Sequence, residues 1–122
     1  CHQAQNAMIA LSIGEPPAAE PGTEAHMARH LWAMERLWEG LVTPSDAAWA
    51  AGSGVLADEP LAGSSFSDDP QLEAELAELA GRIHALGAEA ATVVELGPRG
   101  QLYGQMLATC APCHTRVQGM LP

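Results

Sequence analysis

The sequence has no lysine, and its five basic residues are all arginines, set against fifteen Asp and Glu residues. The resulting net charge of −10 excludes nucleic acid as a partner, because no cluster of cations is present to neutralise a run of phosphates. An acidic surface of this kind either serves solubility alone or attracts a partner with a basic surface. The composition leaves both interpretations open.

Long apolar runs and the usual catalytic motifs are also missing. No stretch of 18 or more apolar residues is present, so the sequence predicts no membrane-spanning helix. There is no Gly-rich phosphate loop after a strand and no Ser-centred elbow, and the carboxylates are spread over the predicted helix exteriors. We therefore expect a protein that is not an enzyme.

Large apolar side chains are scarce. Hydrophobic residues make up 48 % of the chain, but much of that share is alanine, with one Phe, one Tyr and three Trp. A chain of 122 residues forms one domain, and its core must be thin in large side chains. An apolar cofactor buried among helices would supply the missing bulk.

The periodicity of apolar residues predicts four helices and no strand. The expected ranges are about 24–40, 44–58, 70–95 and 99–118, begun by Thr23, Thr43-Pro44 and Asp69-Pro70 and ended at Gly40 and Gly97-Pro98. Short connections favour an all-α, antiparallel up-down-up-down four-helix bundle over residues 23–122, with the end of the last helix beside the start of the first. Residues 1–22 contain three prolines within six positions and are predicted to be a tether or docking arm.

The most informative motif is Cys110-Ala111-Pro112-Cys113-His114, which has the spacing of a covalent c-type haem attachment site. Residues three apart share a helix face, so Cys110 and Cys113 can reach one edge of a macrocycle, and His114 can act as the proximal iron ligand. A Cys-x-x-Cys pair can also be a redox dithiol or half of a zinc site. A zinc site would require a second pair of this kind, and a thioredoxin-like site would require a βαβ pattern. The sequence contains neither.

With this motif in the last of four helices, the chain resembles the class II c-type cytochromes, which include cytochrome c-prime and its low-spin relatives. The resemblance covers roughly residues 23–118. It implies one covalent haem c, a periplasmic setting, possible dimerisation through the first two helices, and either electron transfer or binding of small gases at an open iron. Family members often carry a basic residue one turn past the histidine, where this chain has Gln118 and offers only Arg116.

The residue opposite His114 decides between these functions, because a methionine there favours electron transfer and an empty site admits gases. Met27 and Met34 are about 10 Å apart along a helix axis, so one iron cannot bind both. Met27 is the first choice, because it lies nearest the helix start, and His30, one turn on, is the second. His26 is expected to face solvent, and His84 to be a hydrogen-bonded or surface histidine.

Three further residues are candidates for contact with the haem. Arg29 and Arg99 are the cations best placed for its propionates, and Tyr103, two turns before Cys110, could hydrogen-bond a propionate. Plain surface or boundary roles are the alternatives for all three.

The expected function is a monohaem cytochrome that carries single electrons outside the cytoplasmic membrane. Its partners would be redox proteins with basic surfaces or a membrane electron-transfer complex. A five-coordinate protein that binds NO or CO is the first alternative, and a haem-bearing docking subunit of a respiratory or photosynthetic complex is the second. Cys1 is what lipoprotein processing would leave at a mature N-terminus, so a lipid anchor there is a further expectation.

Overall fold

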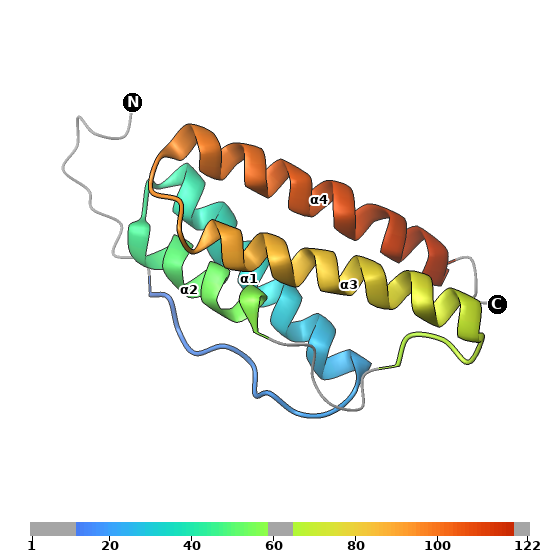
Figure 1. Cartoon of the computed structure of the whole chain (residues 1–122). Coiled ribbons are helices and arrows are strands. Elements are labelled where there is room, and N and C mark those ends of the chain that lie inside the picture. The colour runs from blue at the N-terminus through green and yellow to red at the C-terminus, as the bar shows by residue number, and fades with distance from the viewer. Residues whose placement is uncertain (1–11, 59–64, 119–122) are drawn as a thin grey trace.

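The computed structural model describes residues 12–58 and 65–118, and in these ranges it contains four helices and no strand (Figure 1). The helices are α1 (Thr23–Val42), α2 (Asp46–Ala57), α3 (Pro70–Ala90) and α4 (Leu96–Gln118). The predicted all-α four-helix bundle is therefore confirmed. None of these helices is both long and apolar enough to cross a membrane.

Successive helices run antiparallel. Arg29 near the start of α1 pairs with Asp58 at the end of α2, whereas Gly40 near the end of α1 lies against Trp49 near the start of α2. In the same way, the carboxylate of Glu75 in α3 accepts a hydrogen bond from Arg116 near the end of α4. Figure 1 shows the same alternation, because the colour gradient along the chain runs in opposite directions in successive helices.

The ends of the helices follow local sequence signals, with two corrections. Asp69 caps α3 as predicted, because its carboxylate accepts from the backbone N–H groups of Gln71 and Leu72 and Pro70 opens the helix. At α2 the cap is Ser45, whose hydroxyl accepts from the Ala48 N–H, and not Thr43. Thr23 was expected to cap α1 but is its first residue.

Glycine and proline mark helix ends less strictly than expected. Gly40 does not end α1; it is buried inside the helix, where α2 approaches. Gly97 and Pro98 lie in the first turn of α4 instead of preceding it. Proline is tolerated there because the first-turn N–H groups have no intrahelical partner in any case. Helix α3 ends at Ala90, five residues earlier than the predicted limit of 95.

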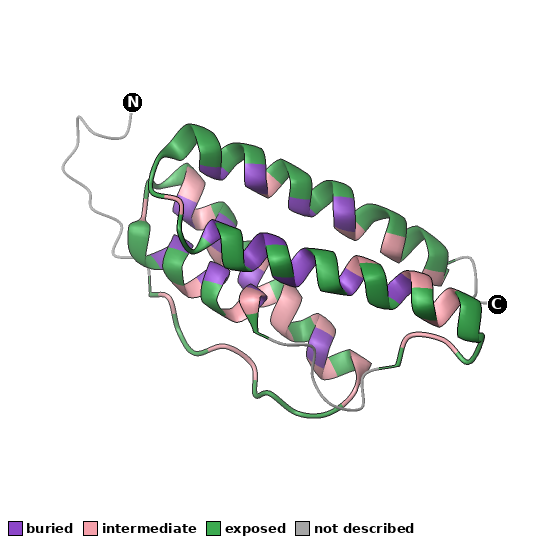
Figure 2. Cartoon of the chain, in the orientation of Figure 1, coloured by how far each residue is buried: buried purple, intermediate pink, exposed green. Residues whose placement is uncertain are grey.

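The core is built mainly where α2 packs between α1 and α3. Its buried residues line the facing sides of the helices (Figure 2), and they include Leu37, Trp49, Leu56, Ile83, Leu86, Leu102 and Met106. Gly52 and Gly87 allow close contact: a Cβ at Gly52 would lie 2.6 Å from the Ala33 carbonyl oxygen, and one at Gly87 would lie 2.7 Å from the Ala57 nitrogen. We call these two contacts the glycine seam.

The described part of the N-terminal arm, residues 12–22, lies against α1. The Arg36 guanidinium donates to the Ile13 carbonyl at 3.0 Å, and that of Arg29 donates to the Pro17 carbonyl at 2.7 Å. Two of the five arginines thus hold this segment to the bundle. Cys1, the predicted point of lipid attachment, lies outside the described residues.

Candidate functional site

The five-residue motif lies near the end of α4. Cys110 and Cys113 are partly buried and in no disulfide, and His114 is exposed. Cys110 packs against the hydrophobic core. Pro112 lies inside the helix, where it removes one backbone donor at the motif itself.

A pocket joins this motif to the start of α1, as the bundle topology predicted. Cys110, Cys113 and His114 line it from α4, and Met27 and His30 line it from α1. The remaining lining residues are Phe66, Leu79, Ala80, Ile83 and Thr109. The volume of the pocket is about 20 Å³, which is room for roughly one water molecule. The three motif residues and both candidates for the distal ligand therefore line one pocket.

The chemistry of the two thiols argues against a redox dithiol. Burial raises the pKa of both thiols, and the neighbouring Cys113 adds to the effect on the pKa of Cys110. Both groups are therefore protonated thiols near neutral pH. Catalytic dithiols work through a thiolate whose pKa is lowered by nearby cations or a helix N-terminus.

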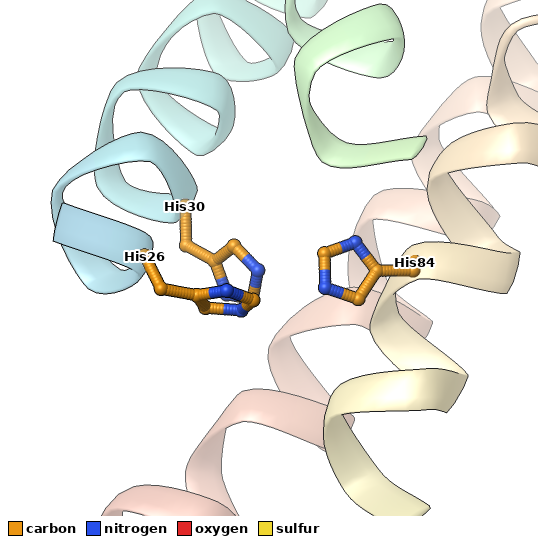
Figure 3. A group of neighbouring side chains, drawn as sticks. All are labelled: His26, His30 and His84. Carbon is orange, nitrogen blue, oxygen red and sulfur yellow. The ribbon is translucent and has the colours of Figure 1, made fainter. Parts of the chain in front are cut away.

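Three histidines meet beside this pocket, two from α1 and one from α3. The ring centroids of His26 and His30 are 4.3 Å apart, and that of His84 is 5.2 Å from the first and 5.0 Å from the second. Figure 3 shows the rings turned toward one another across the gap between the two helices. Phe66 packs edge-on against His26 at 6.0 Å, so an aromatic ring covers one side of the cluster.

Burial keeps the α1 histidines of this cluster uncharged. The pKa of His30 is lowered to about 3, first by burial and then by repulsion from His26, His84 and His114. The pKa of His26 is lowered by burial and by nearby His84 and Arg29. Neutral imidazoles carry a lone pair on one ring nitrogen and are common metal ligands.

The other predicted haem contacts lie elsewhere. Arg99 lies near the start of α4, whereas the motif lies near the end of that helix. The Arg99 guanidinium donates to the Val93 carbonyl at 3.0 Å and to Asp46 at 2.7 Å. Arg29 is engaged with the arm and with Asp58. Tyr103 lines a separate groove of about 480 Å³ together with residues of α1 such as Met34 and Trp38. The structure brings none of these three residues into the pocket lining.

Two residues of the histidine cluster were not predicted as site residues. His26 was expected to face solvent, and this was wrong: it is only 2 % exposed. His84 is buried and hydrogen-bonded to the Leu56 carbonyl, in line with one of its two expected roles. The spacing of four between His26 and His30 could have indicated a pair on one helix face. The approach of His84 depends on how α3 packs, for which the sequence has no local signal.

Comparison with protein-family models, with curated proteins and with solved structures gives no match for this chain.

Proposed function

We propose that the protein is a c-type cytochrome that carries single electrons, with one covalent haem held by Cys110 and Cys113 and with His114 as the proximal ligand. The observation that carries the proposal is the shared pocket. The two thiols and the histidine of α4 open onto the same space as Met27 and His30 of α1. A covalent haem c, when bound, supplies an iron that gains and loses one electron.

The donor chemistry of the pocket fits this group. Neither thiol takes part in a disulfide, and both are protonated near neutral pH. The two cysteines lie about one turn apart on one helix. The rest of the lining is largely apolar, with Leu79, Ala80, Ile83 and Phe66. Such a lining suits a largely apolar macrocycle.

The volume of the pocket places a condition on the proposal. A space of about 20 Å³ is far smaller than a haem, so the helices must separate at this end when one is attached. The contact between α1 and α4 is the least extensive of the packed helix pairs in the described chain. Opening the bundle between these helices therefore breaks less packing than opening it at α2.

Met27 remains the first choice for the distal ligand, and His30 the second. Both line the pocket, but the imidazole of His30 is also in contact with those of His26 and His84. Met27 has no such competing partners among the contacts of the described residues. A thioether ligand also favours electron transfer over gas binding, because it fills the sixth position and raises the potential.

The proposed setting is the outer side of a bacterial cytoplasmic membrane. The net charge of −10 suits association with basic redox proteins or with the basic face of a membrane electron-transfer complex. Association of this kind weakens steeply with ionic strength.

An absorption spectrum of the full chain, produced in cells that attach c-type haem, tests the proposal. We expect a low-spin spectrum in the reduced state that does not change when CO is added. Protein that is purified from such cells without covalent haem would contradict the proposal outright. A five-coordinate spectrum that shifts with CO would replace electron transfer by gas binding.

Single substitutions then identify the distal ligand. Met27→Leu, which nearly conserves volume, should give a high-spin reduced iron that binds CO, because the thioether is lost. Met34→Leu is the matched control on the same helix and should leave the spectrum unchanged. If His30→Gln alone produces the high-spin form, His30 is the ligand and the assignment of Met27 is wrong.

A further inference from the structure

The cluster of His26, His30 and His84 has the composition of a metal site that is separate from the attachment motif. One ring nitrogen from each histidine lies within 4.8 Å of the other two. Ligands bound at 2.0–2.1 Å to a tetrahedral zinc ion are about 3.3 Å apart. The rings therefore need to draw together by about 1.5 Å at most, which small side-chain rotations supply.

Two of the rings carry polar atoms that packing alone does not explain. Nε2 of His26 and Nε2 of His30 are buried and have no hydrogen-bond partner among the described residues. His26 is 2 % exposed, so water does not reach its ring freely. Buried polar atoms in native proteins are nearly always paired, so two unpaired ring nitrogens in one cluster call for a common binding partner.

His84 is oriented as metal-binding histidines are. Its Nδ1 lies 2.7 Å from the Leu56 carbonyl oxygen, and because a carbonyl can only accept, Nδ1 is the protonated nitrogen. Nε2 is then the nitrogen with the lone pair. A backbone carbonyl that fixes the second nitrogen of a ligating histidine is a recurrent feature of metal sites.

We propose that His26, His30 and His84 bind one divalent transition-metal ion of borderline softness, with zinc as the reference ion. Three imidazoles leave a fourth position for water or a solute, as in open zinc sites. The ion would join α1 to α3, two helices that share little direct packing in the described chain. It would lie beside the pocket that His30 lines together with the motif of α4.

The proposal is compatible with the haem proposal and does not depend on it. If Met27 binds the iron, His30 is available to the second metal. If His30 binds the iron, the three-histidine site cannot form in the haem-loaded protein. Haem content and zinc content are therefore measured on the same samples, so that failure of one proposal is distinguished from failure of the other.

Titration calorimetry with zinc chloride and zinc K-edge X-ray absorption on the full chain test the site. We expect one zinc per chain, bound by nitrogen or oxygen at 2.0–2.1 Å and with no sulfur at about 2.3 Å. Absence of stoichiometric zinc binding would overturn the proposal. A sulfur shell would overturn it as well, since it would assign the metal to Cys110 and Cys113.

Variants locate the bound ion. His26→Gln should weaken zinc binding by at least about 100-fold, because one of three protein ligands is lost. This variant is the preferred one, because Nε2 of His26 has no hydrogen-bond partner in the described ranges that the substitution would remove. His2→Gln, at a histidine outside the described residues, is the control and should bind zinc like the parent chain. Equal binding by the parent and by His26→Gln would contradict the proposal.

Discussion

The two sides of the bundle are packed by different means. On the α2 side, glycines bring backbone against backbone: α2 approaches α1 at Gly52 and α3 at Gly87. On the α4 side, the pocket between α1, α3 and α4 is lined by His30, His114, Cys110 and Cys113, and the other two histidines of the cluster, His26 and His84, lie beside it.

The difference separates stability from chemistry. Close-packed interiors lose much when a single atom is added or removed, whereas a region filled by polar donors gains little stability from them. The glycine seam is thus a close-packed contact on which stability depends, and the donor-rich side is the part to which both proposals assign a ligand. Substitutions at the glycine seam should change the free energy of unfolding, whereas substitutions on the α4 side should mainly change ligand binding.

The largest expected effect is on the α4 side of the bundle, and it is a loss of the proposed cofactor without a loss of fold stability. If the proposed haem is attached at Cys110 and Cys113, the double variant Cys110→Ala and Cys113→Ala should lose it completely, because neither thiol remains to form a thioether. Haem staining on a denaturing gel measures this. Cys1→Ala is the control and should retain the haem. Covalent haem in the double variant would refute the assignment of the attachment site.

Next in size is a loss of stability at the glycine seam. Gly52→Ala should lower the free energy of unfolding by about 3 kcal/mol, because the added Cβ meets the Ala33 carbonyl and the Leu37 side chain. Urea denaturation measures the change. Gly54→Ala, on the same helix with open space around it, should instead raise stability by up to about 1 kcal/mol. Equal effects of the two substitutions would mean that α2 does not approach α1 as described.

A smaller loss is expected at Trp49, which closes the α2 side near the start of that helix. Its indole N–H donates to the Ala90 carbonyl at 2.8 Å, and the Arg99 guanidinium lies 5.1 Å from its ring centroid. Trp49→Phe should cost about 2 kcal/mol in thermal or urea unfolding. Trp38→Phe, at a side chain that is 53 % exposed, should change stability by less than about 0.5 kcal/mol.

The smallest expected effects compare two histidines of the cluster in the presence of EDTA. His26→Leu should leave stability unchanged or raise it by up to about 1 kcal/mol, because an unpaired buried nitrogen is removed. His84→Leu should lower it by about 1 kcal/mol, because the Leu56 carbonyl loses its donor. A strong destabilisation by His26→Leu would show that this ring stabilises the fold through packing, and it would count against a role in binding a metal.

Much of the architecture could be predicted because its signals are local. The cap at Asp69-Pro70, the apolar spacing along α3 and the short connections together predict four antiparallel helices. The antiparallel order then brings the motif of α4 to the Met27 end of α1, and the pocket lining agrees. Helix ends were less predictable: Gly40 serves close packing and not termination, which its own sequence neighbourhood does not reveal.

The sequence by itself determined the helical class, the Cys-x-x-Cys-His motif on which the haem proposal rests, and which end of the first helix faces that motif. Only the tertiary structure decided that His26 is buried and that His84 joins it and His30. The physical reason is that periodicity fixes which residues share a face of one helix, whereas the rotation and separation of neighbouring helices depend on packing. Here that packing is set by Gly52 and Gly87, which let α2 draw close to α1 and α3, and His84 bonds to the same α2 residue, Leu56, that packs against Gly87.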